Sequence, residues 1–251
     1  MRLSFVIPAY NEEASLGGCL ESILEQTRQL ETPVEILVVN NASTDATREV
    51  AMRYPGVQVV DEPRKGLTYA RQAGFAVATG ELVANVDSDS RLTPGWCDRV
   101  LRAFANDAKL VCVSGPLIYY DLPTRQRAMV RVFYLLAFTT YAINRWLLRV
   151  GSMVQGGNFV VTRQALLEIG GFDTSIAFYG EDTDIARRMS RVGRVKFTLS
   201  QPMFSSGRRL RHEGVMTMAS RYTANYLSTI FLKRPVTDEY VDIREAVQVA
   251  E

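Results

Sequence analysis

The sequence has few of the residues that build cross-linked or metal-bound proteins. It holds three cysteines, Cys19, Cys97 and Cys112, an odd number without CxxC spacing. A disulfide framework and a cysteine-rich zinc site are therefore disfavoured, and the reducing cytosol is the expected compartment. The single histidine, His212, excludes a metal site built on several imidazoles and more than one histidine general base.

Long hydrophobic runs and glycine-rich phosphate loops are also missing. No uncharged apolar stretch reaches the roughly 18 residues that a membrane-spanning helix needs. The apolar residues 3–7 stop at Pro8 and are too few for the core of a signal peptide. Neither GxGxxG after this segment nor GxxxxGK with Ser or Thr occurs, which argues against dinucleotide-binding dehydrogenases and P-loop NTPases. We expect a cytoplasmic protein, with peripheral contact at the inner face of a membrane as an open alternative.

What is present is an ordinary globular composition. The 251 residues are 47% hydrophobic and 22% charged, which suits one large domain with a buried core. The net charge of +2 is uneven: residues 1–121 carry 16 acidic and 11 basic side chains, and residues 122–251 carry 11 acidic and 18 basic ones. Residues 122–167 and 185–212 contain no acid. These basic blocks indicate either an anionic partner, such as a diphosphate, lipid headgroups or nucleic acid, or a solvated basic face.

The first half alternates apolar segments with amphipathic ones, which predicts an α/β fold with a mostly parallel central sheet and helices on both faces. Ser43 or Thr44 is the expected cap of the second helix. Runs rich in Val, Ile and Leu predict buried strands at Leu3–Ile7, Glu35–Val39, Val57–Val60, Leu82–Val86 and Leu110–Ser114. Helices are predicted at Ala14–Arg28, Asp45–Tyr54 and Thr68–Ala78, with another that starts at Thr93-Pro94.

The second half is less regular. Beyond Pro235 the tail is polar and is predicted to pack little. The pattern predicts a long helix over Arg125–Val150, a strand at Phe159–Thr162, helices at Gln164–Ile169 and Asp182–Val192, and an amphipathic helix over Met216–Leu232.

In sheets of this kind, ligands bind beyond the carboxyl ends of the strands, so the residues just after each strand are the first candidates for a site. Asp87 and Asp89 follow the strand Leu82–Val86 two positions apart, and in an extended chain both carboxylates point the same way. Mg²⁺ and Mn²⁺ favour such carboxylates completed by substrate phosphates. A simple Asx turn explains the same residues without a ligand.

Other charged residues have two interpretations each. Glu181 and Asp182 open a predicted helix, where acids complement the helix dipole, but in a cleft one of them suits a general base. Arg71 lies on a predicted helix, where it is either solvated or able to bind a phosphate through two guanidinium nitrogens. His212 stands among arginines, which favour a neutral imidazole able to bind metal, although a lone histidine is more often structural.

Together and in this order, the motifs resemble those of the inverting family-two glycosyltransferases of GT-A fold. The resemblance spans residues 3–213, and the Gln-x-x-Arg-Trp motif of processive synthases is absent, which implies single-sugar transfer. The matching motifs are VIPAYNEE at 6–13, VNNASTD at 39–45, KGLTYARQAG at 65–74, ATGE at 78–81, Asp87-Ser88-Asp89, GGFD at 170–173 and EDTD at 181–184 with Arg188.

The resemblance implies a role for each matching residue. Asp182 would be the general base that deprotonates the acceptor hydroxyl, and Asp89 would bind Mn²⁺ or Mg²⁺ together with His212. Asn40 falls where many members carry an aspartate that contacts the base, which leaves the nucleotide open. Contacts to the nucleotide sugar would come from Pro8, Ala9, Tyr10, Glu12, Asn40, Arg71, Asp87 and Ser88, and the acceptor or sugar side would hold Gly157, Asn158 and Glu181.

The implied partners are a nucleotide-diphosphate sugar donor and a sugar or lipid-linked acceptor in cell-envelope or polysaccharide synthesis, and no nucleic acid. We expect a nucleotide-sugar-binding half at 1–121, an acceptor-binding and catalytic half of the same domain at 122–213, and an amphipathic helix and tail at 214–251. The basic and apolar segments 125–150 and 215–234 either contact a membrane, cover the sheet or form an oligomer interface.

Two other functions remain open from the sequence. A sugar-phosphate nucleotidyltransferase shares a related sheet and metal site, but it usually opens with a glycine-rich basic loop, which is absent after Leu3–Ile7. A non-catalytic nucleotide-sugar-binding module is the second alternative. The presence of Asp182 beside an intact Asp87-Ser88-Asp89 motif argues against it.

Overall fold

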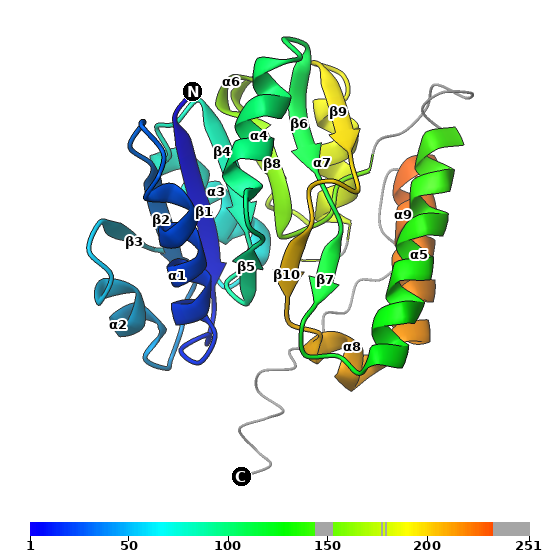
Figure 1. The fold of residues 1–251 in the computed structure, drawn as a ribbon, viewed down its shortest axis with the longest axis horizontal. Helices are drawn as coiled ribbons and strands as arrows, with labels where there is room; N and C mark the ends of the chain where they lie inside the picture. The colour runs from blue at the N-terminus through cyan, green and yellow to red at the C-terminus, as the bar shows by residue number, and fades with distance from the viewer. Residues whose placement is uncertain (144–152, 177, 179, 233–251) are drawn as a thin grey trace.

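The computed structural model describes residues 1–143, 153–176, 178 and 180–232 (Figure 1). A central sheet has seven strands in the spatial order β3 (Val57–Asp61), β2 (Glu35–Asn40), β1 (Leu3–Ala9), β4 (Leu82–Val86), β8 (Asn158–Thr162), β6 (Leu110–Ser114) and β9 (Arg194–Phe197). Neighbouring strands are parallel except β8, which is antiparallel to both β4 and β6. The prediction of a mostly parallel sheet is therefore confirmed.

Helices cover both faces of this sheet. Strand β1 is buried along its whole length, as its largely apolar sequence predicts. Its Phe5 and Ile7 side chains join one hydrophobic cluster, whereas Val6 between them joins the other. The first cluster includes residues of α1 (Leu16–Thr27), α2 (Thr47–Met52) and α4 (Trp96–Ala105), and the second includes residues of α3 (Leu67–Val77), α6 (Arg163–Glu168) and α7 (Glu181–Met189).

A second, three-stranded sheet adjoins the central one. Its order is β5 (Ser90–Leu92), β10 (Met203–Ser205) and β7 (Leu117–Tyr119), and β10 leads into the short helix α8 (Arg208–Glu213). Strand β10 is antiparallel to β5 and parallel to β7. The sequence analysis did not predict β5, β7, β9, β10 or α8, because segments of three to six residues carry too little periodicity to be distinguished from loops.

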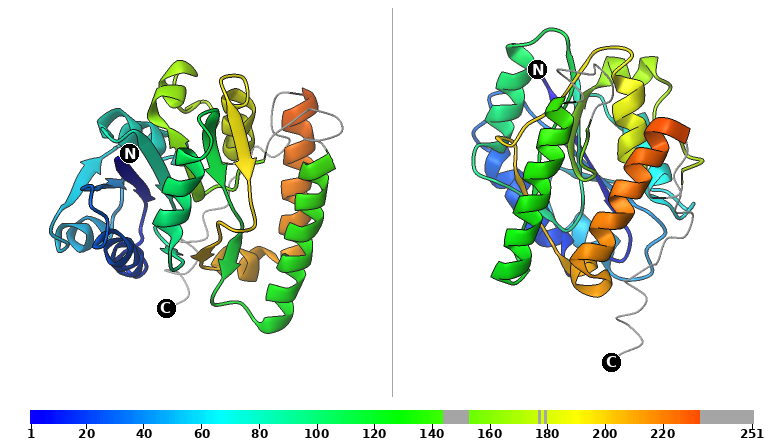
Figure 2. Two further views of the ribbon diagram at one scale, coloured as in Figure 1. Left: turned by 45° about the horizontal axis from the view of Figure 1, so that its top comes forward. Right: turned by 90° about the vertical axis from the view of Figure 1, so that its right-hand side faces the viewer.

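Helices α5 (Thr124–Ile143) and α9 (Val215–Leu232) lie side by side along one flank of the molecule (Figure 2). The helix predicted over Arg125–Val150 is confirmed as far as Ile143, and residues 144–152 lie outside the described residues. The tail beyond Pro235 also lies outside them. Within the described ranges, every helix is too short or too polar to cross a bilayer.

The predicted start of α4 is wrong. The helix begins at Trp96, after Gly95 with a φ of +71°, and not at Thr93-Pro94. The Thr93 hydroxyl donates a hydrogen bond to the Pro202 carbonyl oxygen at 2.7 Å, next to β10. This tertiary contact takes the side chain that the sequence pattern assigned to the helix cap.

The predicted cap of α2 is wrong for a similar reason. Ser43 accepts a hydrogen bond from the Asn11 backbone N–H at 3.2 Å, and Thr44 donates its own N–H to the Asn11 side chain at 2.8 Å. A carboxylate oxygen of Asp45 instead accepts the Thr47 N–H at 3.0 Å. Residues 43 and 44 therefore join the loop after β2 to the loop after β1.

Candidate active site

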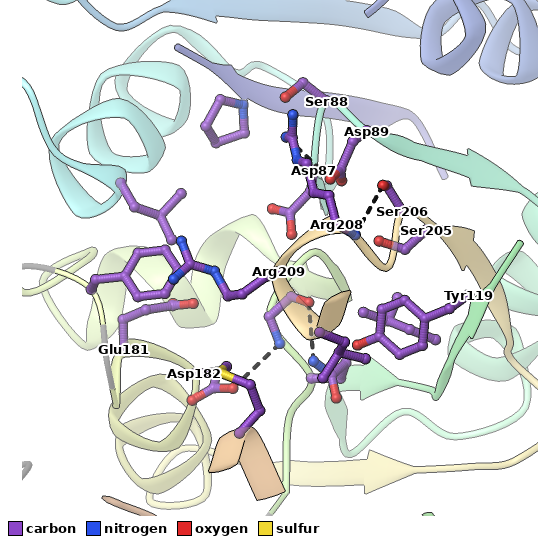
Figure 3. A pocket seen from close by; sticks show the side chains of 18 of the residues that line it. Asp87, Ser88, Asp89, Tyr119, Glu181, Asp182, Ser205, Ser206, Arg208 and Arg209 are labelled. Carbon is purple, nitrogen blue, oxygen red and sulfur yellow. Dashed lines mark hydrogen bonds and ion pairs between the residues drawn. The ribbon is translucent and has the colours of Figure 1, made fainter. Parts of the chain in front are cut away.

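A pocket lies at the carboxyl ends of β1 and β4, and α7, α8 and the small sheet complete its walls (Figure 3). This is the edge at which ligands bind in parallel α/β sheets. Its polar lining comes from segments far apart in the sequence: Arg71, Asp87, Ser88, Asp89, Tyr119, Gln155, Glu181, Asp182, Ser205, Ser206, Arg208 and Arg209.

The turn between β4 and β5 brings two carboxylates to the pocket. The Asp87 carbonyl oxygen accepts the Ser90 N–H at 2.9 Å, which closes the turn and places Asp87 and Asp89 on the pocket wall. Gly157 packs directly against the Asp87 carboxylate and has a φ of +75°. A Cβ at position 157 would overlap that carboxylate, so the glycine provides the room that Asp87 occupies.

Arg71 is a deeply buried charge of the site. Its side chain is 1% exposed, although it lies on a helix where the sequence allowed a solvated role. It forms an ion pair with Glu181 and a second one with Asp87 at 3.3 Å, and its guanidinium lies 5.2 Å from the centre of the Phe159 ring. Arg71 thus connects the Asp87 turn with the start of α7.

Helix α7 begins with Glu181 and Asp182, which both line the pocket. Burial raises the pKa of Glu181 to about 7, opposed by the positive charge of Arg71. Burial also raises the pKa of Asp182, whose carboxylate accepts the N–H groups of Thr183 at 2.7 Å and Gly156 at 3.4 Å. A carboxylate with a raised pKa that lines a pocket is a candidate proton acceptor.

Arg208 stands at the first position of α8 and reaches two carboxylates. Its guanidinium forms an ion pair with Glu12, which is buried, and lies 3.2 Å from a carboxylate oxygen of Asp89. The loop before it is held by Asp121, whose carboxylate accepts the Ser206 hydroxyl at 2.7 Å and the Gly207 N–H at 2.6 Å. Positive charge is therefore fixed beside the Asp89 carboxylate.

The other predicted donor contacts lie where β1 and β2 end. Pro8 lines the pocket and Ala9 is buried. The Tyr10 hydroxyl accepts a hydrogen bond from the Lys65 ammonium at 2.9 Å. The side-chain amide of Asn40 donates a hydrogen bond to an Asp61 carboxylate oxygen at 2.8 Å. The end of β2 is therefore joined to the end of β3.

Seven predicted site residues are not among those that line the pocket: Ala9, Tyr10, Glu12, Asn40, Gly157, Asn158 and His212. Asn158 is fully buried: its amide group donates to three backbone carbonyl oxygens, and its oxygen accepts the Trp96 ring N–H at 3.2 Å. Those contacts hold β8 to the segments around the small sheet. His212 is exposed on α8, one turn beyond the arginine that reaches Asp89.

The carboxylates of the pocket fit a divalent cation only in combination with another ligand. In the described part of the chain, no group of three or more His, Cys, Asp and Glu side chains could hold a metal ion. Asp87 and Asp89 supply two carboxylates, which is the usual protein share when phosphate oxygens and waters complete a Mg²⁺ or Mn²⁺ site. The structure does not bring His212 to them.

The sequence analysis missed several pocket residues. Arg208 and Arg209 were noted only as the surroundings of His212, although both line the pocket and His212 does not. The signal was present: 185–212 is a basic block without acid, which suits an anionic ligand. No local pattern marks Tyr119 or Gln155, because they come from β7 and from the segment before β8.

A family model described as "Glycosyl transferase family 2" matches residues 4–170. Among curated proteins, the putative glycosyltransferase EpsH of Bacillus subtilis (strain 168) is 33% identical over 123 residues, which cover 47% of this chain and 35% of EpsH. The glucosyl-dolichyl phosphate glucuronosyltransferase of Haloferax volcanii is 24% identical over 188 residues, which cover 72% of this chain and 59% of that protein. The chain thus spans about a third to three fifths of these relatives.

Among solved structures, the mannosyltransferase PcManGT from Pyrobaculum calidifontis, in complex with GDP-Man and Mn²⁺, superimposes with a TM-score of 0.66. The identity is 21%, and the match covers 97% of this chain and 66% of that one. At this identity the likeness concerns the fold alone, and it confirms the expected GT-A architecture.

Proposed function

Because this chain belongs to glycosyl transferase family 2, we propose that it moves one sugar from a nucleotide-diphosphate sugar to an acceptor hydroxyl, with inversion at the sugar carbon. The observation that carries this proposal is the joint presence, in one pocket, of paired carboxylates at 87 and 89, three arginines and the Glu181–Asp182 pair. These groups supply what such a transfer requires: an anion-binding side and a proton acceptor.

The donor diphosphate would lie between Arg71 and Arg208. Charge builds on the leaving diphosphate as the glycosidic bond breaks, and fixed guanidinium groups stabilise it without reorganisation. Arg71 is held by Glu181 and Asp87, and Arg208 by Glu12 and Asp89. The base and ribose would lie over the ends of β1 and β2, near Pro8, Tyr10 and Asn40.

Metal dependence is part of the proposal. Asp87 and Asp89 would hold Mn²⁺ or Mg²⁺ jointly with the diphosphate, and the structure of PcManGT, one of the similar proteins, contains Mn²⁺. When bound, the cation supplies positive charge that stabilises the leaving diphosphate. A role for His212 as a further ligand is not supported by its place on α8.

We assign the general base to Asp182. Its carboxylate lines the pocket, carries a raised pKa and is oriented by the N–H groups of Thr183 and Gly156. Glu181 is committed to the ion pair with Arg71, which makes it a positioning residue. Proton transfer from the acceptor hydroxyl to Asp182 accompanies attack on the sugar carbon from the face opposite the diphosphate.

A lipid-linked acceptor fits the apolar part of the pocket wall. Leu210 of α8 and Met218 of α9 line the pocket, and α9 packs against α5 and α7. These helices carry the basic and apolar character that the sequence analysis connected with a membrane. The inner face of a membrane would then be the place of action.

The test is a thermal-shift panel of nucleoside diphosphates and nucleotide sugars, with and without Mn²⁺, on the wild type and Asp89→Asn. A ligand at about 100 times its Kd stabilises by about 2.7 kcal/mol, which raises the Tm of a chain of this size by several degrees. We expect a Mn²⁺-dependent shift with one nucleotide that Asp89→Asn abolishes. Absence of any shift, or release of pyrophosphate from a nucleoside triphosphate and a sugar phosphate, would contradict the proposal.

A further inference from the structure

The outward side of α5 is apolar, although it faces away from the core. Met129, Val132, Leu135 and Leu136 are 37, 55, 56 and 63% exposed. Positions 129, 132 and 136 follow helical spacing and lie on one side of the helix, and 135 adjoins them. These four side chains are called the outer row of α5.

The inward side of the same helix packs against the rest of the protein. Val130, Tyr134 and Tyr141 are buried and lie on the side opposite the outer row. The Tyr134 hydroxyl donates to Gln155 at 2.8 Å and accepts the Leu117 N–H at 3.2 Å. These contacts fix the orientation of α5 on the protein, with the outer row on its surface.

The charge around the outer row has one sign. Arg125 is exposed and lies four residues before Met129, on the same side of the helix, and Arg131 is exposed at its border. No acidic residue occurs between 122 and 167, and α9, which lies beside α5, contains none (Figure 2). A surface that combines apolar side chains with arginines complements an anionic, amphipathic partner.

We propose that the outer row of α5, with Arg125 and Arg131, docks this protein on an anionic lipid bilayer. The apolar side chains enter the interface of the bilayer while the arginines contact the lipid phosphates. A second copy of the chain fits less well, because two outer rows face to face would bring arginines together without an acid on either helix to pair them. Binding to the bilayer does not depend on the proposed function. The idea that it brings the pocket to a lipid-linked acceptor does rest on that function.

The position of α5 relative to the pocket gives this docking a consequence. Gln155, which accepts the Tyr134 hydroxyl, lines the pocket, as does Met218 of the neighbouring α9. The helix that contacts the bilayer therefore also forms the support of the pocket wall. An acceptor held in the bilayer would reach the site along this side of the molecule.

The experiment is sedimentation of the full chain with vesicles, without donor or acceptor. Vesicles of phosphatidylcholine are compared with vesicles that contain about one third phosphatidylglycerol, at low and high salt. We expect binding to the anionic vesicles only, and weaker binding at high salt. Equal binding to both kinds of vesicle, or no binding to either, would overturn the proposal.

Variants locate the surface. We expect L135Q/L136Q to lower the vesicle partition coefficient at least about tenfold, since two apolar side chains no longer leave water. The matched control is L167Q, because Leu167 lies on α6 and is 52% exposed, and it should bind like the wild type. R125Q should lower binding roughly fivefold, and R102Q on α4, also an exposed arginine, should not. If L167Q and R102Q lost as much vesicle binding as L135Q/L136Q and R125Q, the outer row of α5 would not be the docking surface.

Two further measurements separate the outcomes. Light scattering should give the same molar mass for the wild type and L135Q/L136Q, and a dimer that these substitutions convert to monomers would assign the outer row to self-association instead. Nucleotide-dependent thermal shifts should be the same in both proteins, because neither leucine lines the pocket. If the wild type showed no nucleotide-dependent shift, that result would count against the proposed function. It would not affect the docking proposal, which is tested by vesicle binding.

Discussion

One guanidinium nitrogen of Arg208 lies 3.2 Å from a carboxylate oxygen of Asp89. The same nitrogen forms an ion pair with the buried Glu12, so one positive charge of the chain is shared between two carboxylates. A divalent cation bound at Asp89 would replace that charge and leave Arg208 available to a diphosphate oxygen. In the proposed mechanism, Arg208 and the cation would thus be alternative counter-charges for the Asp89 carboxylate.

Arg208→Ala should weaken nucleoside diphosphate binding in the presence of Mn²⁺. A hydrogen bond between a guanidinium and a phosphate contributes about 1.5–3 kcal/mol, which corresponds to about a 10- to 100-fold rise in Kd. Calorimetric titration measures the effect, and Arg191→Ala, an exposed arginine after α7, is the control. Equal affinities for Arg208→Ala and the wild type would show that this side chain does not face the diphosphate.

Asp182→Asn should keep nucleotide binding and lower kcat by roughly 10²–10⁴-fold, because the amide cannot accept the proton of the acceptor. Glu181→Gln should act differently: it removes the charge that holds Arg71, so Kd for the donor rises as well as kcat falling. Steady-state kinetics and calorimetry on the two variants distinguish these patterns. Near-normal turnover of Asp182→Asn would remove this residue from the role of base.

Glu181 should make stability depend on pH. Burial raises its pKa from 4.5 to about 7, so the folded state binds more protons than the unfolded state between these values. The stabilisation is complete below about pH 4.5 and is lost as pH rises through about 7, by at most about 3 kcal/mol. Urea unfolding at about pH 5 and pH 8 should show a decline in the wild type that is smaller in Glu181→Gln. Parallel declines in the two proteins would place the titrating group elsewhere.

Gly157→Ala should disturb the Asp87 carboxylate. The residue has a positive φ, and the added methyl group would occupy space that the carboxylate fills. Gly170→Ala is a matched control: Gly170 has a similar φ of +81° but nothing within 4 Å of the added carbon. Both variants should lose about 1 kcal/mol from the backbone, and only Gly157→Ala should also lose Mn²⁺-dependent nucleotide binding. Comparable nucleotide affinities in the two variants would argue against this contact.

The sequence predicted those parts of the fold that rest on local periodicity. Strands such as Leu82–Val86 are mostly apolar runs, and their position in a parallel sheet follows from the alternating helices. The short strands β5, β7 and β10 are fixed instead by pairing with one another across the chain. Thr93 is another example: its contact with the Pro202 carbonyl oxygen joins residues far apart in the sequence, so a local sequence pattern cannot predict it.

The candidate site shows a similar division. The carboxylates at 87, 89, 181 and 182 all line the pocket as the motifs suggested. His212 was named as a metal ligand on the resemblance alone, whereas in the structure Arg208, one turn earlier on α8, lies beside Asp89 and His212 is exposed and does not line the pocket. The resemblance alone placed Asn158 on the acceptor or sugar side, and its burial became evident only from the hydrogen bonds that it makes across the fold.

The contact between Glu12 and Arg208 joins positions 196 residues apart. During synthesis, strands β1 to β4 can pair long before α8 leaves the ribosome, because their hydrogen-bonding partners are much closer in sequence. Until α8 has docked, the early-folding half presents its acidic pocket without the balancing guanidinium. The ion pair that balances the charge of Glu12 is therefore completed late in folding, when α8 reaches the loop after β1.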